Sequence, residues 1–376
     1  MSKVGDGMVV VALPLEALRI HGSVSPAIAI ALVETAPYVL AVALSLFFGL
    51  SRHRFPARTL LAADAAVRCL LFTLLAALAL TDNLRLWVLG VALFGGSALR
   101  LLAGSSRRLV ATGMVESGER FAVNGLLGTS DSLAAYVAGP VLGGLIAAVA
   151  SPGFVLLLDG VSFVGLLVVV FVAVPAGRTQ STADPVSGWT ILWRVPLAGR
   201  LFVVVFFFNL LYMPVEVALP LLVRGPLHAG GQALGVMWTA FGVGALLGAL
   251  ATNRLRRLSR GPLLVAIIAG WSASVLVLSV APNIAVAAGA FALGGLIYAP
   301  FTPIAYSLVQ DALQPAEQQP VITLWAAGAT IAAPLGLALS GPLIEALHSH
   351  GGLLISAALT LALVPFAAQA LRDNPA

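Results

Sequence analysis

The sequence is poor in charged residues and contains a single cysteine. Only 9% of its 376 residues are charged, 60% are hydrophobic, and the mean hydropathy is +1.03. A soluble domain carries about 25% charged residues, so this chain lacks the polar surface that a water-soluble globule of its length needs. The one cysteine, Cys69, excludes an intramolecular disulfide and a metal site built on cysteines. These shortages favour an integral membrane protein.

Motifs that bind nucleotides or metals are missing as well. The chain has no P-loop, so ATP does not drive a reaction through it, and it has no His-Glu-x-x-His pair. The five histidines are scattered, and we interpret "HSH" at 348–350 as a solvated loop. The net charge of +5 could suggest a nucleic-acid partner, but the basic residues form no single face. We therefore expect neither an enzyme nor a nucleic-acid binder, and no cofactor or metal.

Apolar runs recur along the whole chain, and each approaches the roughly 20 residues that a helix needs to cross a bilayer. Turn sequences such as "HGSVSP", "TDN" and "ASPG" separate the runs. This pattern predicts an all-α integral membrane protein with twelve transmembrane helices. The predicted spans are residues 4–20, 26–50, 59–80, 85–106, 121–149, 152–174, 200–223, 231–252, 262–281, 284–308, 319–345 and 351–371.

The basic residues predict which loops face the cytoplasm. If the N-terminus lies inside, all but three of the 20 lysines and arginines fall on the inner side, the exceptions being Arg19, Arg85 and Arg224. Cytoplasmic loops of membrane proteins carry an excess of Lys and Arg. We therefore expect both termini in the cytoplasm and the chain in the cell membrane, which is the inner membrane if the source is bacterial.

A repeated phrase suggests that the chain consists of two similar halves. The pentapeptide "VALPL" starts at Val11 and again at Val217, and "AGPVLGG" at Ala138 has a counterpart in "AAPLGL" at Ala332. One pentapeptide could recur by chance in a chain rich in Val, Ala and Leu, but several features in the same order indicate a duplication. The longest polar stretch lies between the halves. We predict two pseudo-symmetric six-helix bundles, 1–175 and 200–376, joined by a cytoplasmic linker, 176–199.

Four phrases carry a resemblance to a known family: "VGDGMVVVALPL", "LLAADAAVR", "AYVAGPVLGG" and "LLLDGVSFVG". Through them the chain resembles the major facilitator superfamily of secondary transporters over nearly its whole length. It is most similar to the bacterial branch of macrolide and siderophore exporters. The resemblance implies alternating access of two bundles around a midplane site, and export of a small molecule in exchange for protons.

The fifth predicted helix carries the most informative phrase. Drug:proton antiporters of this superfamily have G-x-x-x-G-P-x-x-G-G there, and the matching positions are Ala135, Gly139, Pro140, Gly143 and Gly144. Small residues let helix backbones approach closely in lipid, and a proline bends the helix. We expect Gly244 and Gly248 of the eighth predicted helix to form the partner face. By the resemblance this contact seals the outward side, and the alternative is ordinary helix packing.

The loop after the second predicted helix matches the family in part. The family has G-x-x-x-D-R-x-x-R-R at this inner gate, and Gly49, Arg54 and Arg58 fit, whereas His53 stands at the aspartate position. A histidine is neutral or partly cationic near neutral pH, so the charge relay of the gate is altered in this chain. In the alternative interpretation the arginines only anchor the loop on the cytoplasmic side.

Ionisable residues inside membrane helices are costly, so each is a functional candidate. Asp131 lies near the predicted midplane on the same helical stripe as the glycine motif. It is our first candidate for the proton-coupling residue, followed by Glu34, Glu216 and Asp6, and a purely structural carboxylate is the alternative. We interpret Glu16 and Glu216, beside the two VALPL phrases, as acids on a cavity rim that would suit cations.

The central cavity should otherwise be apolar with few hydrogen-bonding groups. Its candidate lining residues are Asn209, Tyr212, Met213, Trp238, Thr239, Tyr298 and Trp325, for which packing is the simpler alternative. We predict a monomeric transporter in the lipid bilayer that exports an amphiphilic small molecule, such as a drug, antibiotic or siderophore, in exchange for protons. The alternatives are an uncoupled facilitator or lipid flippase of the same fold, and a membrane receptor or regulatory protein.

Overall fold

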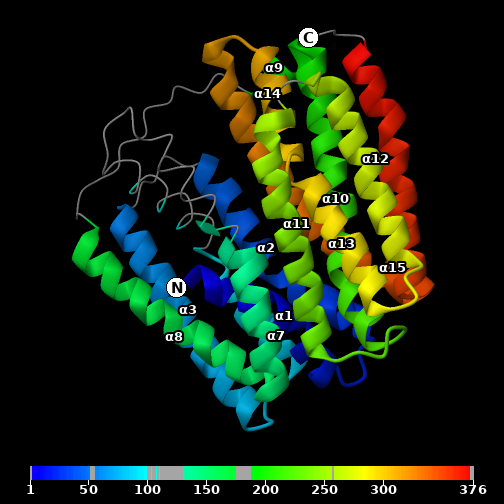
Figure 1. Ribbon diagram of the computed structural model, residues 1–376. Coiled ribbons are helices and arrows are strands. Elements are labelled where there is room, and N and C mark those ends of the chain that lie inside the picture. The colour runs from blue at the N-terminus through cyan, green and yellow to red at the C-terminus, as the bar shows by residue number, and fades with distance from the viewer. Residues whose placement is uncertain are drawn as a thin grey trace. The chain divides into compact units, whose positions relative to one another are not determined.

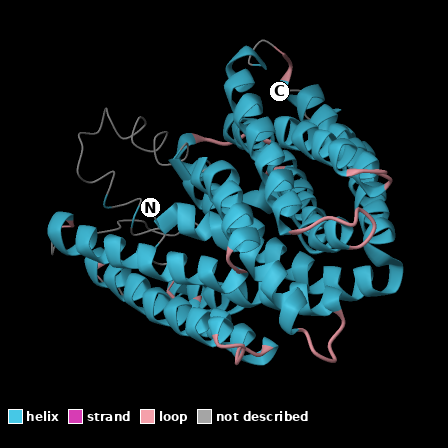
Figure 2. Cartoon of the chain, turned by 60° about the horizontal axis from the view of Figure 1, so that its bottom comes forward, coloured by secondary structure: helices cyan, strands magenta, loops and turns pink. Residues whose placement is uncertain are grey.

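The computed structural model describes residues 2–50, 56–99, 103, 107, 110, 130–131, 133–174, 188–255 and 258–372. Helices make up most of this part of the chain (Figure 1), and no strand occurs in these ranges (Figure 2). Eight helices in them are long and apolar enough to cross a membrane. This confirms the predicted all-helical membrane class, while the count of twelve helices stays a prediction.

The chain divides into two compact units. Unit 1 comprises Met1–Ser181 together with Ala229–Thr239, and unit 2 comprises Thr182–His228 together with Ala240–Ala376. Helix α11 (Gly231–Leu255) begins in unit 1 and ends in unit 2. The predicted bundles 1–175 and 200–376 and their linker stay a prediction.

Unit 1 is organised around its first helix. Apart from the start of α11, its described elements precede the predicted linker, and α1 contacts α2, η2, α7 and α8. Helix α3 packs along α8, and the two lie side by side in Figure 1. The elements are α1 (Ser2–Ile20), α2 (Pro26–Leu50), α3 (Ala57–Leu80), α4 (Leu86–Gly96), the π-helix η2 (Ala134–Ala138), α7 (Gly139–Val149) and α8 (Pro152–Ala173).

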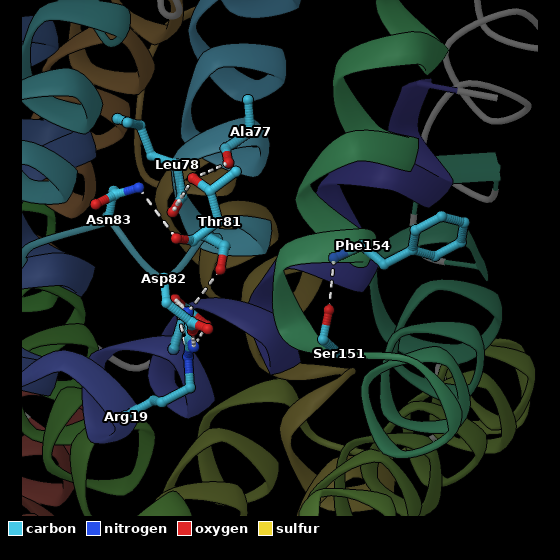
Figure 3. A network of polar contacts seen from close by, with 10 residues as sticks. Arg19, Ala77, Leu78, Thr81, Asp82, Asn83, Ser151 and Phe154 are labelled. Carbon is cyan, nitrogen blue, oxygen red and sulfur yellow. Dashed lines mark hydrogen bonds and ion pairs between the residues drawn. The ribbon is translucent and has the colours of Figure 1, made fainter.

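Proline and hydroxyl residues mark the helix starts, as the turn chemistry predicts. Helix α8 begins with Pro152, and the Ser151 hydroxyl accepts a hydrogen bond from the Phe154 amide at 3.2 Å (Figure 3). Pro140 lies just inside α7, directly after the π-helix, where its missing N–H and its ring disturb the regular hydrogen-bond ladder. The fifth predicted helix is therefore irregular at its glycine motif.

Unit 2 contains the remaining elements. Helix α10 packs against α9, α14 and α15, and α12 packs against α13, α14 and α15. In Figure 1 the helices α10, α12, α13 and α15 run alongside one another. The elements are α9 (Gly188–Arg194), α10 (Pro196–Arg224), the second part of α11, α12 (Arg260–Ser279), α13 (Ile284–Tyr298), α14 (Phe301–Asp311) and α15 (Pro315–Arg372).

Three details of unit 2 refine the predicted spans. Helix α15 is interrupted at His348, whose φ of 60° and ψ of 176° are not helical, so it consists of two helices in line with the predicted spans 319–345 and 351–371. The predicted span 284–308 is broken near Pro300 into α13 and α14. The predicted linker contains the short helix α9, whose seven residues are too few to give a clear sequence pattern.

Candidate functional site

A buried arginine forms the centre of a charge cluster in unit 1. Arg68 lies in the middle of α3, its side chain is 12% exposed, and it forms an ion pair with Asp6 of α1. Its guanidinium carbon lies 4.3 Å from the centre of the Phe163 ring on α8 and 5.8 Å from that of Phe72. These contacts hold the cation between three helices and away from water. Arg68 falls within the predicted span 59–80, and the structure places it in α3.

Two further carboxylates belong to this cluster. Asp64, one turn before Arg68 on α3, and Asp159 of α8 both interact electrostatically with Arg68. Asp159 is fully buried, and Asp64 is 7% exposed. The Lys3 ammonium, which is more exposed, donates a hydrogen bond to Asp6 at 3.1 Å. Three acids thus surround one buried guanidinium, with one additional cation at the edge.

The cluster opens onto a small cavity. The cavity measures about 90 Å³ and is lined by Asp6 and Arg68 together with Glu34 and Tyr38 of α2 and apolar residues of α1, α3 and α4. Sites for drug-sized ligands measure about 300–1,000 Å³, whereas this space suits a few water molecules. Two of the predicted proton-coupling residues, Asp6 and Glu34, therefore face the same water-sized space in unit 1.

The other two predicted proton-coupling residues lie elsewhere. Asp131 forms an ion pair with Arg107, and its side chain is 36% exposed. Glu216 lies in α10 of unit 2, half-buried, and no described residue forms a hydrogen bond or ion pair with it. The structure therefore places Asp6 and Glu34 on one cavity, whose lining does not include Asp131. The assignment of the proton site to any of the four stays a prediction.

Glu16 is buried and helps to join α1 to the end of α3 through Arg19, so it does not lie on an open cavity rim. It is fully buried and forms a 2.6 Å ion pair with Arg19 at the end of α1. Arg19 also donates a hydrogen bond to Asp82, in the turn that follows α3 (Figure 3), and another to the Ala79 carbonyl oxygen at the end of α3. The charge of Glu16 is compensated within unit 1, so it is not available to attract a cation.

The antiporter-type glycine motif packs its backbone against α1. A Cβ added to Gly139 would lie 2.5 Å from the Cα of Gly7, and one added to Gly143 would lie 2.8 Å from the Cα of Met8. Both distances are far below the normal contact distance between carbon atoms. These positions of the motif therefore admit only glycine without a shift of the helices. Ala135, the departure from the family pattern, lies in η2 next to Gly7 as well.

The partner of this motif on α11 differs from the predicted one. A Cβ added to Gly144 would lie 2.9 Å from the Cα of Gly235, at the start of α11. Gly244 and Gly248 instead lie against the backbone of α13, at Ala292 and Leu296. The prediction that Gly244 and Gly248 face the fifth helix is wrong. The motif does use α11, but about two turns earlier, because a helix has several small-residue faces and the spacing alone does not select one.

The inner-gate residues are described in part. Gly49 lies in α2, whereas His53 and Arg54 lie outside the described residues. Arg58, in the first turn of α3, donates a hydrogen bond to the Phe171 carbonyl oxygen at 3.0 Å. Its guanidinium carbon lies 5.4 Å from the Phe171 ring centre. Arg58 thus joins the start of α3 to the end of α8.

Most of the predicted cavity residues are packed inside their own unit. Tyr212, Trp238 and Trp325 are each at most 6% exposed. Asn209 donates a hydrogen bond to the Val205 carbonyl oxygen of its own helix at 2.8 Å, which satisfies its amide locally. Tyr298 is half-buried. These contacts agree with a packing role, and a role of the same residues in lining the central cavity stays a prediction.

Unit 2 has an aromatic cluster at its centre. The Tyr212 ring centre lies 5.2 Å from that of Trp271 and 5.3 Å from that of Tyr298, and Trp271 and Tyr298 are 5.4 Å apart. Phe241 of α11 lies against the same rings, 6.2 Å from Trp271. Aromatic pairs at these distances stabilise a core beyond their buried area. The cluster joins α10, α11, α12 and α13.

The fold agrees with that of solved transporters over the whole chain. The chain is similar to a structure of the nucleoside transporter NupG, with a TM-score of 0.75 and 12% identity over 99% of this chain and 97% of that one. It is also similar to a bacterial homologue of the human lysosomal transporter Spinster, with a TM-score of 0.69 and 11% identity over 100% of this chain and 96% of that one. At these identities the likeness concerns the fold alone.

Comparison of the sequence with protein families adds information that the fold alone does not give. The model of the Major Facilitator Superfamily matches residues 201–376. The second half of the chain is therefore similar to this superfamily. Together with the eight described helices that are long and apolar enough to cross a membrane, the match points to a multi-span membrane transporter and not to an enzyme.

The curated relatives that this chain is similar to include an efflux pump. It is 28% identical over 229 residues to the multidrug efflux pump Tap of Mycobacterium tuberculosis, and equally to Tap of Mycobacterium bovis. The match covers 57% of this transporter and 54% of Tap, so the chain spans about half the length of the curated relatives it matches. The likeness fits the drug-exporter branch that the sequence motifs indicate.

Proposed function

We propose that this transporter exports an amphiphilic small molecule, of the drug, antibiotic or siderophore type, from the cytoplasm in exchange for protons. The likeness to a multidrug efflux pump supports the direction and the class of cargo. The glycine motif packed against α1 supports antiport, since the family's exporters carry it in their fifth helix. We place both termini in the cytoplasm, on the basic-residue asymmetry of the loops.

The charge cluster around Arg68 is the observation that carries the proton part of the proposal. The three carboxylates of Asp6, Asp64 and Asp159 outnumber the two cations described beside them, Arg68 and Lys3, and Asp64 and Asp159 are buried. Buried charge of one sign is costly, and a proton bound to one carboxylate relieves it. The neighbouring cavity, with Glu34 and Tyr38 in its wall, would supply the water that delivers the proton.

Four consecutive residues connect this proton site to the glycine motif. Gly5 lies against the Asp159 carboxylate, Asp6 pairs with Arg68, Gly7 touches the backbone at Gly139, and Met8 touches Gly143. In our proposal, binding or release of a proton at a carboxylate of the cluster changes the electrostatic attraction between Arg68 and Asp6. Because the peptide bonds on both sides of Asp6 are rigid, the change reaches the Gly7 contact one residue away, where α1 and α7 must shift together. The segment Gly5–Met8 is thus the proposed coupling element.

The test is proton flux in inside-out vesicles with an acid interior. Amphiphilic antibiotics and siderophores would be added outside, and proton release would be followed with a pH-sensitive dye. We expect release with the wild type and none with Asp159→Asn or Asp6→Asn. Asp82→Asn is the matched control, because it removes an exposed acid from the same unit.

Substrate exchange at equal pH on both sides separates coupling from folding. The Asp159→Asn variant should still exchange labelled substrate, because exchange needs binding and alternation but no net proton movement. If release survives in both cluster variants and is lost in Asp131→Asn or Glu216→Gln, the proton site lies there instead. Transport without any proton release would sink antiport and leave an uncoupled facilitator.

A further inference from the structure

A large cavity at one end of unit 2 plays no part in the export mechanism proposed above. It measures about 810 Å³ and lies between the first turns of α12, the last turn of α14 and the last turns of α15. In Figure 1 these three helix ends lie together at the end of unit 2 where the C-terminus is marked. By the predicted topology this end faces the cytoplasm, since α12 follows the basic loop that contains "RLRRLSR".

The inner wall of this cavity is apolar. Val265 and Ala269 of α12 line it, with Leu308 of α14 and with Ala368 and Leu371 of α15. Gly261 leaves ordinary contact distance to Leu371, 3.7 Å from an added Cβ, so the two helices are not pressed together at the mouth. A wall of this kind accepts a hydrocarbon chain, because no buried polar group would lose a hydrogen bond to it.

The mouth of the cavity is polar and carries more positive than negative charge. Ser259, Arg260, Asp311 and Arg372 line it. Arg260 and Asp311 form an ion pair, so their charges cancel and the Arg260 side chain is held at the mouth. Arg372 is exposed, and no described residue forms an ion pair with it. Among the described residues of the mouth, positive charge therefore exceeds negative charge by one.

We propose that this cavity binds an anionic phospholipid of the cytoplasmic leaflet. The phosphate would lie between Arg372 and Arg260, with the Ser259 hydroxyl in reach, and an acyl chain would follow the apolar wall towards Ala269. Basic pockets between membrane helices on the cytoplasmic side recognise anionic headgroups in this way. The uncompensated charge at the mouth selects an anionic headgroup over a zwitterionic one. The volume, within the range of ligand sites, suits a headgroup and part of one chain.

This site is independent of the proposed export function. All its residues belong to unit 2, whereas the charge cluster and the glycine motif belong to unit 1. A bound lipid would bridge α12, α14 and α15 and stabilise unit 2. We therefore expect the transporter to be more stable in the presence of anionic lipid, whatever molecule it exports.

Native mass spectrometry of the purified full chain in detergent tests the proposal. Phosphatidylglycerol and phosphatidylcholine of the same chain length would be titrated separately. We expect discrete one-to-one adducts with phosphatidylglycerol at concentrations where phosphatidylcholine gives few. An arginine near an anionic surface contributes about fivefold in affinity, so Arg372→Gln should weaken the phosphatidylglycerol adduct by about that factor.

Two more variants separate the cavity from the general charge of the protein. Ala269→Trp fills the apolar wall and should reduce the adduct without any change of charge. Arg224→Gln is the matched control, because Arg224 is an exposed arginine at the far end of α10, and it should leave the adduct unchanged. Thermal unfolding of each variant checks that it is folded.

Three results would overturn the proposal. Equal adducts with phosphatidylcholine would show that the headgroup charge is not read. An adduct that is insensitive to both Arg372→Gln and Ala269→Trp would place the lipid elsewhere. Displacement of the lipid by millimolar inorganic phosphate, with no effect of Ala269→Trp, would indicate a site for free phosphate in place of a lipid.

Discussion

Helices α1 and α3 of unit 1 meet through an ion pair, whereas α10 and α12 of unit 2 meet through aromatic rings. In unit 1, Asp6 of α1 is ion-paired with Arg68 of α3. The repeated phrase that aligns Val11 with Val217 also aligns Asp6 with Tyr212 of α10. Tyr212 stacks on Trp271 of α12, with 5.2 Å between the ring centres. Corresponding places in the two halves thus hold an ion pair in one and an aromatic stack in the other.

The correspondence extends to the positions on the partner helices. Arg68 is the twelfth residue of α3 and Trp271 the twelfth residue of α12. The glycine contact has a counterpart too, since a Cβ on Gly336 of α15 would lie 2.7 Å from the Met213 side chain of α10. Met213 aligns with Gly7. If the two halves arose by the predicted duplication, their common packing positions now hold charged side chains in unit 1 and aromatic side chains in unit 2.

The difference suggests how proton coupling and substrate binding are divided between the two units of an antiporter. A charged pair responds to a proton, because protonation changes its Coulomb energy. A stack of rings does not respond to protons, but it offers a rigid apolar face to an amphiphilic molecule. We therefore assign the proton to unit 1 and expect the aromatic cluster of unit 2 to support the substrate side.

The largest effect is expected when the buried cation of unit 1, Arg68, is removed. Arg68→Leu leaves three carboxylates without their buried partner. Loss of one partner of a buried ion pair costs about 3–5 kcal/mol, so we expect a large drop in the free energy of unfolding, measured by SDS unfolding in mixed micelles. The double variant Arg68→Leu/Asp6→Asn should recover part of the loss. No recovery, or a drop below about 1 kcal/mol, would contradict the cluster.

A smaller effect is expected at the glycine contact of unit 1. Gly139→Ala places a Cβ 2.5 Å from the Cα of Gly7, and both sides are backbone that cannot rotate away. Overpacking of this kind costs about 1–3 kcal/mol, and export should fall with it. Gly165→Ala is the control, because no atom lies within 4 Å of its added Cβ. It should gain up to about 1 kcal/mol from helix propensity. Equal effects of the two variants would speak against the contact.

The smallest effect is expected at the aromatic position of unit 2. Tyr212→Leu removes the stack on Trp271, which contributes about 0.5–1.5 kcal/mol beyond the buried area. The variant should remain folded and should still release protons, but its KM for aromatic substrates should rise. Tyr212→Phe keeps the ring and should behave as the wild type. A loss of proton release in Tyr212→Leu would show that the division between the units is not valid.

The sequence predicted the helices well because their signals are local. Apolar length, proline and turn residues act within one segment, and Pro26, Ser151 and Asn283 mark helix starts where the structure has them. The family and the transporter class also followed from short phrases. The interruption at His348 fell between two predicted spans for the same reason.

Contacts between helices were harder to predict. With the N-terminus inside and a rise of about 1.5 Å per residue, Asp6 lies near the inner end of the predicted span 4–20 and Asp159 in the outer third of the span 152–174. In the structure, however, Gly5 lies against Asp159. Such counting assumes straight helices along the membrane normal, whereas tilt and rotation depend on packing. The cluster did leave one local signal, since Asp64 and Arg68 are four residues apart on one helix face.

The contact between Gly7 and Gly139 has a consequence for genetics. Every missense change at either codon adds at least one carbon atom to a gap that has no room for it. Elsewhere on these helices many substitutions point into lipid and are absorbed. A random-mutation screen for loss of export should therefore find both glycine codons far more often than their share of the gene, with alanine as damaging as larger residues.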